Sequence, residues 1–235
     1  MTWLERLSLR LRFGLWGQLR ANHHPSFYLS HSQYGEDMIA RDLLSDVARG
    51  TFVDVGAHHP VYYSNTYHFY RRGWRGLVVD AAPGTKELFD LLRPGDIAVE
   101  ACLAAEGGGS VEYFLFNQPA LNTTDPATAE ANLSRPGVKL LRRHTMPTVP
   151  LDALLEQHLP GRTIDLLSID IEGLDEEILA SHDWERWRPR VVIVERDRLD
   201  PLKIAADSLV IRLGGLGYTV RGTCGPSLVL SSATS

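Results

Sequence analysis

Thr51-Phe-Val-Asp-Val-Gly-Ala57 is a run of strand-forming residues that ends abruptly in a glycine turn. A second apolar run, Gly76-Leu-Val-Val-Asp80, ends in an acid. A buried strand, a glycine turn and an acid closing the next strand are typical of a nucleoside pocket. Glycine lets the backbone approach the ligand, and the carboxylate can bond both ribose hydroxyls. We therefore expect an α/β sheet with a nucleoside site at its edge.

The fingerprint of pyrophosphate-binding turns, G-x-G-x-x-G, is absent, because His58 and Val61 stand where its other glycines would be. This favours a nucleoside without a diphosphate, and S-adenosylmethionine is the leading candidate. On this segment alone, an ordinary tight turn in an α/β protein explains the residues equally well, because single glycine turns are weak signals.

The composition indicates one large globular domain. The chain has 235 residues, of which 44% are hydrophobic and 23% charged, and this allows an ample core. The formal net charge of −5 provides no basic surface, so nucleic acid is not an expected partner. Cys102 and Cys224 lie in apolar runs. We expect them to be buried thiols in a reducing, cytoplasmic compartment, and nothing requires a disulfide between them.

The N-terminal segment, residues 1–31, is predicted to be an amphipathic helix or arm. Apolar residues recur at helical spacing among charged ones between Met1 and Arg20. No apolar stretch approaches the ~20 residues of a membrane helix, so no integral membrane association is expected. The segment suits a helix docked on its own domain, a homodimer arm or a membrane-surface helix, and packing against protein is favoured.

Periodicity predicts alternating helices and strands through residues 32–235. Strands are expected at 51–55, 76–80, 164–169 and 190–194, and strands at about 97–103 and 111–116 are expected to continue the sheet or its edge. Helices are expected around 64–72, at 84–92, from Leu151 to Leu159, from Leu174 and around 202–213, and closing strands at about 218–223 and 227–230. This order predicts a class I methyltransferase (Rossmann-like) sheet. Such a sheet is mostly parallel, with an antiparallel C-terminal edge strand and helices on both faces. Its ligands bind beyond the carboxyl ends of the strands, where Asp54, Asp80, Asp170 and Glu195 lie.

The pattern breaks down over about 117–144, where Asn, Thr, Pro, Ala and Gly predominate. Loops of this length in compact domains are usually lids, binding loops or disordered segments. We predict a lid that closes over an acceptor.

Six motifs, in order, resemble the FkbM family of methyltransferases over about Ser32 to Glu195. They are Ser32-Gln-Tyr-Gly-Glu-Asp37, Phe52-Val-Asp-Val-Gly-Ala57, Ser64-Asn-Thr66, Gly73-Trp-Arg-Gly76, Ser168-Ile-Asp-Ile-Glu-Gly173 and the run from Pro189 to Glu195. Two details depart from the family pattern: the His58-His59-Pro60 loop, and Asp80 where many relatives carry glutamate. Either carboxylate can reach a ribose.

The resemblance implies methyl transfer from S-adenosylmethionine, commonly to a hydroxyl oxygen of a sugar or natural product. Family substrates include macrolide hydroxyls and sugar units of bacterial glycans, among them partly methylated mannosides, and the short chain favours a small acceptor. The alternative is a metal-independent N-methyltransferase or protein methyltransferase on the same fold. A non-catalytic cofactor-binding protein is disfavoured by the retained acids and glycine. The predicted cofactor-binding residues are Gln33, Tyr34, Glu36, Asp54, Gly56, Ala57, Ser64, Asn65, Asp80, Ala81, Cys102 and Leu103.

Three carboxylates, Asp170, Glu172 and Glu195, are expected at adjacent strand ends. In a continuing strand Asp170 and Glu172 would face the same side, and such carboxylates repel unless a cation or proton intervenes. This predicts a Mg²⁺ site. In the alternative, Glu172 caps a helix and Asp170 binds the methionine ammonium group of the cofactor.

A sugar hydroxyl is a poor nucleophile at neutral pH and needs a base, a metal or both. The predicted catalytic residues are His144 and Asp170. His144 is the preferred base, because it follows the long segment and enters the strand that leads to Leu151. His58 and His59, on the cofactor loop, are the next choices. Tyr62, Tyr63 and Tyr67 could supply aromatic faces for a sugar ring, although a packed core uses such residues more often.

Overall fold

The computed structural model describes residues 3–10, 28–171, 173–196, 200 and 202–232. A seven-stranded sheet forms its centre, in the order β3-β2-β1-β7-β8-β10-β9. The first five strands run parallel, and β10 is antiparallel to both β8 and β9. Their bounds are β1 Thr51–Val55, β2 Arg75–Asp80, β3 Ile97–Glu100, β7 Leu166–Ile169, β8 Val191–Glu195, β9 Tyr218–Cys224 and β10 Ser227–Ser232.

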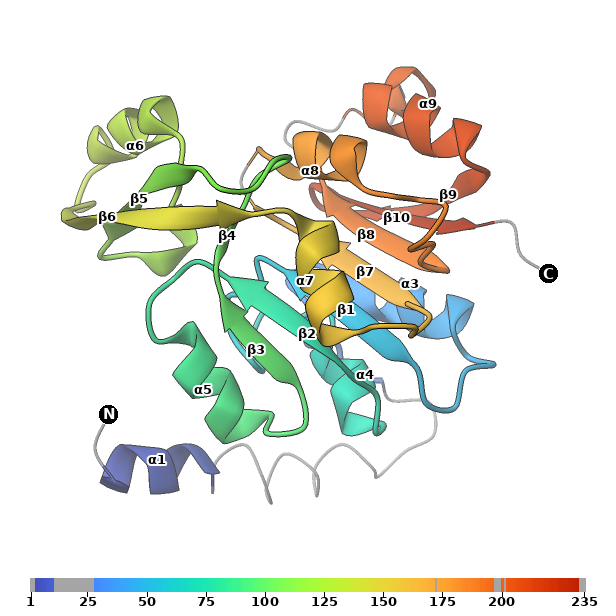
Figure 1. Ribbon diagram of the computed structural model, residues 1–235, viewed down its shortest axis with the longest axis horizontal. Coiled ribbons are helices and arrows are strands. Elements are labelled where there is room, and N and C mark those ends of the chain that lie inside the picture. The colour runs from blue at the N-terminus through green and yellow to red at the C-terminus, as the bar shows by residue number, and fades with distance from the viewer. Residues whose placement is uncertain (1–2, 11–27, 172, 197–199, 201, 233–235) are drawn as a thin grey trace.

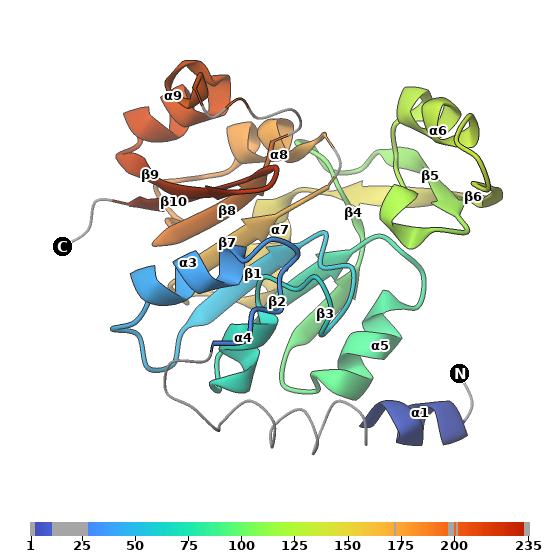
Figure 2. The ribbon, with the colours of Figure 1, turned by 180° about the vertical axis from the view of Figure 1, so that it is seen from behind.

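Helices cover both faces of this sheet (Figures 1 and 2). One face packs against α3 (Glu36–Leu43), α4 (Tyr67–Arg71) and α5 (Thr85–Leu92). The other face packs against α7 (Leu151–His158), α8 (Asp175–Ser181) and α9 (Ser208–Gly215), which follows the short helix η3 (Ile204–Ala206). The class I methyltransferase sheet predicted from the sequence is confirmed. The antiparallel strand β10 lies one place inside the edge, and its hairpin partner β9 is the outermost strand.

The side chains of β1 alternate between the two faces of the main sheet, and both faces are buried. Val53 and Val55 belong to the core beneath α7, α8 and α9, whereas Phe52 belongs to the core beneath α3, α4 and α5. Because successive side chains of a strand point to opposite faces, Asp54 lies on the same face as Phe52. That orientation decides the role of Asp54 described below.

A second sheet, of order β4-β6-β5, stands beside the first (Figure 1). Its strands are β4 (Cys102–Leu103), β5 (Ser110–Phe116) and β6 (Leu140–Val149), and β5 pairs antiparallel with β6. Between them lie η2 (Pro119–Leu121) and α6 (Pro126–Leu133). We call residues 102–149 the insertion.

The insertion corrects three predictions. The strand expected at 97–103 is two strands in different sheets, and the strand at 111–116 does not continue the main sheet. The segment 117–144 is not an irregular loop, because it contains η2, α6 and the first half of β6. Asp125 caps α6 by accepting hydrogen bonds from the backbone N–H groups of Ala127 and Thr128, and Pro126 suits the first turn because it needs no N–H partner there.

The described part of the N-terminal segment is α1 (Trp3–Arg10), which lies beside α5 and pairs Arg6 with Glu87. Trp3 and Leu4 remain largely exposed. The rest of the predicted arm, apart from residues 28–31, is outside the described residues. In the described part of the chain, no helix has the length and apolar character needed to cross a membrane. Cys102 and Cys224 are free thiols, Cys102 buried and Cys224 partly buried.

Candidate active site

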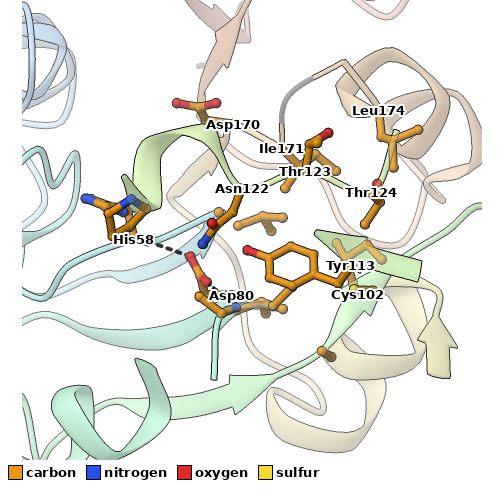
Figure 3. Close-up of a pocket in the computed structure, with 18 of the residues that line it drawn as sticks. His58, Asp80, Cys102, Tyr113, Asn122, Thr123, Thr124, Asp170, Ile171 and Leu174 are labelled. Carbon is orange, nitrogen blue, oxygen red and sulfur yellow. Dashed lines mark hydrogen bonds between the residues drawn. The ribbon is translucent and has the colours of Figure 1, made fainter. Parts of the chain in front are cut away.

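A cavity of about 430 Å³ lies beyond the carboxyl ends of β1, β2, β7 and β8, under the insertion (Figure 3). Gly56 follows β1, Asp80 ends β2, Asp170 follows β7 and Glu195 ends β8. The parallel strands therefore bring together four residues that are far apart in the sequence. We call this space the large cavity.

Asp80 is the acid most firmly fixed in the large cavity. One carboxylate oxygen accepts a hydrogen bond from the backbone N–H of His58, and the other accepts one from the N–H of Ala82, each at 2.7 Å. Burial raises the pKa of the Asp80 carboxyl, and these two hydrogen bonds oppose that rise. A carboxylate oxygen can accept more than one hydrogen bond, so Asp80 retains acceptor capacity for a ligand's hydroxyl groups.

Gly56 allows the turn after β1 to pass close to the turn after β7. Its φ is +74°, and a Cβ at this position would lie 1.7 Å from the carbonyl oxygen of Asp170. The Gly56 N–H donates to the carbonyl of Val79, and the N–H of Asp170 donates to the carbonyl of Val55. The glycine thus serves the contact between two strand ends as well as the approach of a ligand.

Asp54 was predicted to bind the cofactor, but it does not line the cavity. Its side chain is buried on the opposite face of the sheet and accepts a hydrogen bond from the hydroxyl of Thr66. Burial raises the pKa of the Asp54 carboxyl, and the Thr66 hydroxyl and the charge of Arg93 oppose that rise. An acid near a strand end points to the cavity or to the opposite core according to its place in the alternation, and Asp54 points to the core.

The other predicted cofactor residues divide into three groups. Gln33, Ala81, Cys102 and Leu103 line the large cavity together with Gly56 and Asp80. Glu36 and Asn65 line an adjoining cavity of about 20 Å³, the small cavity, which Gln33 also lines. Neither cavity is lined by Tyr34, which is exposed, nor by Ala57, which is packed in the core, nor by Ser64, which is buried and accepts from the N–H of Tyr67.

The segment before α3 is held by a carboxylate. Asp37 accepts from the hydroxyls of Ser30 and Ser32 and from the backbone N–H of His31. The Ser32 hydroxyl also accepts from the N–H of Gly35 at 3.0 Å, while the N-cap of α3 is Gly35 itself. The arrangement fixes the chain on which Gln33 reaches both cavities.

Of the predicted metal ligands, the structure describes Asp170 and Glu195, and both line both cavities. Asp175 fixes the turn after β7 by accepting from the N–H groups of Ile171 and Gly173. Glu172 lies outside the described residues. Within the described ranges, no group of three or more His, Cys, Asp or Glu side chains has an arrangement that could hold a metal ion.

The histidines differ in their relation to the cavity. His144 lies in the middle of β6, paired with Tyr113 of β5, and is not among the lining residues. His58 lines the large cavity. The Nδ1 of His59 accepts from the N–H groups of Val61 and Tyr62, which assigns the proton of the neutral ring to Nε2. The basic nitrogen of this ring, Nδ1, is occupied by the two N–H groups and is not free to take a proton from a substrate. The structure therefore favours neither His144 nor His59 as the base.

Sequence reasoning missed the wall that the insertion provides. Tyr113 of β5 and the residues after η2, Asn122, Thr123 and Thr124, line the large cavity (Figure 3). The Asp125-Pro126 pair is a helix-start signal that could have marked α6, but nothing in the sequence indicates that the residues before it face a cavity. Tyr63, which lines both cavities, was considered only as one of three possible aromatic faces.

The family model described as "Methyltransferase FkbM domain" matches residues 54–209. Two solved structures have a similar arrangement. The C-terminal domain of precorrin-6Y C5,15-methyltransferase from Rhodobacter capsulatus is 13% identical, with 89% of this chain and 92% of that chain covered and a TM-score of 0.40. The O-methyltransferase from Bacillus cereus in complex with SAH is 11% identical, with 97% and 88% covered and a TM-score of 0.38. No curated protein matches the chain.

Proposed function

The chain belongs to the FkbM methyltransferase family, and we propose that it transfers the methyl group of S-adenosylmethionine to a hydroxyl oxygen of a small saccharide or natural product. One observation carries the proposal. The large cavity joins a fixed ribose-binding acid, Asp80, to two more carboxylates, Asp170 and Glu195, and no Lys or Arg is among its described lining residues. Such a lining suits a nucleoside with a cationic sulfonium group and disfavours a pyrophosphate.

The residues that line the large cavity offer partners for each part of the cofactor. Asp80 would accept from the ribose hydroxyls, while Cys102, Leu103 and Tyr113 would provide an apolar surface for the adenine. Burial raises the pKa of the Cys102 thiol to about 11, so this sulfur stays protonated and acts as a packing group. Gln33, Asp170 and Glu195 would then hold the methionine end.

S-adenosylmethionine supplies an electrophilic methyl group, which an acceptor oxygen takes as the carbon–sulfur bond breaks and a thioether leaves. The chain must orient the acceptor hydroxyl and receive its proton. We assign proton acceptance to Asp170, because it lines both cavities and follows directly on a rigid buried strand. His144 would need the insertion to move before it could take this role.

We further propose that Mg²⁺ assists, with Asp170 and Glu195 as ligands and Glu172 as a third. The two described carboxylates supply the oxygen ligands that this ion prefers, although they do not make a complete site by themselves. A bound cation would lower the pKa of the acceptor hydroxyl. The catalytic domain is residues 32–235, and the free thiols of Cys102 and Cys224 support a cytoplasmic location.

An acceptor screen with S-adenosylmethionine labelled on its methyl group tests the proposal. The panel comprises neutral mono- and oligosaccharides, macrolides, amines and peptides, each assayed with Mg²⁺ and with EDTA. We expect label on saccharide or macrolide hydroxyls and a loss of rate in EDTA. Label on amines or peptides alone would identify an N-methyltransferase or protein methyltransferase. Full activity of metal-free enzyme would remove the magnesium proposal and leave the O-methyl transfer in place.

A further inference from the structure

We infer that Tyr63 is the acceptor platform of this enzyme, on which one face of a neutral saccharide ring stacks where the two cavities meet. The inference rests on the proposed function and deepens it, because it names the residue that selects the acceptor and the charge class of the sugar. Three features of the molecule support it: the overlap of the two cavities, the backbone of the loop that carries Tyr63, and the acidic side chains around it.

The two cavities share four lining residues, Gln33, Tyr63, Asp170 and Glu195. The large cavity extends from there toward Asp80, and the small one toward Glu36 and Ser227. With the nucleoside at Asp80, the reacting end of the cofactor reaches the shared residues. An acceptor must approach the transferred methyl group at this junction, and Tyr63 is the aromatic residue among the four.

The loop that carries Tyr63 holds a backbone that non-glycine residues seldom adopt. His58 has a φ of 50° and Tyr63 a φ of 54°. Such a backbone is unfavourable for a residue with a side chain and persists only where the surroundings hold it. The loop is held at both ends and in the middle: the His58 N–H donates to Asp80, Arg93 donates to the carbonyl of Pro60, and the N–H of Ser64 donates to the carbonyl of His31.

Core packing does not account for the Tyr63 ring. The side chain is 63% exposed, and its ring lies beside that of His58 with 6.4 Å between centroids. The neighbouring Tyr62 is 45% exposed and lies against His59, but Tyr62 lines neither cavity. An exposed aromatic ring on a held backbone at a cavity mouth provides a large apolar contact surface at low entropic cost.

The charges at the junction define the class of sugar. Asp170 and Glu195 line the shared region, and Glu36 lines the small cavity. Carboxylates and the amides of Gln33 and Asn65 can bond sugar hydroxyls, but they repel the carboxylate of a uronic acid or the phosphate of a sugar phosphate. A Mg²⁺ ion held as proposed above would offset only part of the negative charge of Glu36, Asp170, Glu172 and Glu195 and would leave the junction acidic. The acceptor is therefore a neutral saccharide.

The test compares the wild type with Tyr63→Asn, Tyr63→Phe and Tyr62→Asn. Asparagine tolerates a positive φ better than most residues, so Tyr63→Asn removes the ring without adding backbone strain. Phenylalanine retains the ring, and Tyr62→Asn is the matched control on the neighbouring tyrosine. The probes are neutral disaccharides of mannose, glucose and galactose and the matching disaccharides that contain a uronic acid. KM and kcat are measured with labelled S-adenosylmethionine. The affinity for S-adenosylhomocysteine (SAH), the cofactor without its methyl group, is measured by calorimetry.

We expect Tyr63→Asn to raise the acceptor KM about tenfold or more, while Tyr63→Phe and Tyr62→Asn stay within about threefold of wild type. SAH affinity should change less than threefold in all variants, which also shows that they are folded. Neutral disaccharides should exceed uronic acid ones at least tenfold in kcat/KM. Equal KM values for Tyr63→Asn and Tyr62→Asn would overturn the inference, as would equal kcat/KM for neutral and uronic acid disaccharides. Either result would leave the proposed O-methyl transfer in place. Wild-type enzyme that methylates none of the disaccharides would overturn the saccharide premise of the inference as well.

Discussion

At the scale of single residues, two acids near neighbouring strand ends have different roles. Asp54 and Asp80 both follow apolar runs in the sequence, yet only Asp80 lines the large cavity. Asp54 bonds Thr66, and Thr66 in turn accepts from the buried guanidinium of Arg93. Asp54 thus belongs to a buried hydrogen-bonded group at the start of α4, and Asp80 faces the large cavity.

Asp80→Ala should weaken binding of S-adenosylmethionine and SAH at least tenfold. Hydrogen bonds to charged groups contribute about 1.5–3 kcal/mol each, and the substitution removes those to the ribose hydroxyls. Calorimetry measures the change, and Asp90→Ala, at an exposed position of α5, serves as the control for loss of an acidic residue. Unchanged affinity in a folded Asp80→Ala protein would show that the ribose lies elsewhere.

His59 should make stability depend on pH. Burial, with a smaller effect of the nearby His58, lowers the pKa of His59 to about 4, against 6.5 for an exposed histidine. Because the folded protein disfavours the charged ring, this histidine's contribution to stability is present above pH 6.5 and is lost as the pH falls toward 4.

His59→Asn replaces Nδ1 by an amide oxygen that can accept from the same two N–H groups but does not titrate. The melting temperature of this variant should therefore decline less steeply between pH 6.5 and pH 4.5 than that of the wild type. His158→Asn in α7 is the control for removal of a histidine. Parallel curves for His59→Asn and wild type would rule out this titration as a source of acid sensitivity.

At the scale of elements, the sequence was sufficient where a helix or strand packs on one core. The strands at 51–55, 76–80 and 190–194 and the helices at 84–92 and after Leu151 appear within a residue or two of their predicted places. Their apolar periodicity reflects burial against the main sheet. The insertion was not predicted, because β5 and β6 pair with each other and pack on small local clusters of their own. Whether it closes over an acceptor remains a prediction.

The turn after β1 gives a test of close approach between elements. Gly56 and Gly161 have similar φ values, +74° and +70°, but a Cβ on Gly56 would strike the Asp170 carbonyl, whereas one on Gly161 would meet nothing within 4 Å. Gly161→Ala should cost about 1–2 kcal/mol for the left-handed backbone alone. Gly56→Ala should cost more than about 3 kcal/mol, beyond the usual effect of a single substitution.

Urea unfolding of both glycine variants measures the difference in the free energy of unfolding. SAH affinity of Gly56→Ala should also fall, since the strand ends that form the cavity must separate. Equal losses of stability in the two variants would mean that the contact between Gly56 and Asp170 relaxes freely.

At the scale of the whole molecule, the cavity has one wall from the main sheet and one from the insertion (Figure 3). The first wall could be predicted, because parallel strands bring their carboxyl ends to one edge. The second could not, because Asn122, Thr123 and Thr124 reach the cavity through the pairing of β5 with β6 and a bridge between Phe114 and Thr123. Such contacts depend on the packing of two sheets, which local patterns do not encode.

Glu195→Gln tests whether the charge of the cavity is matched to a cation. S-adenosylmethionine and SAH share every group except the methyl, which makes the sulfur positive. A carboxylate near the sulfur therefore favours binding of S-adenosylmethionine over SAH. The difference in binding free energy is about 1 kcal/mol or more at an effective dielectric constant near 20.

We expect Glu195→Gln to lower S-adenosylmethionine affinity about fivefold or more relative to SAH, with both ligands titrated in EDTA so that no divalent ion intervenes. Glu177→Gln removes the same charge from an exposed position of α8 and should leave the ratio of the two affinities unchanged. Added salt should reduce the wild-type preference only modestly, since Glu195 is partly buried and buried charges are weakly screened. If Glu195→Gln weakens both ligands equally, the carboxylate does not sense the sulfonium, and the transferred methyl group lies away from the junction of the two cavities.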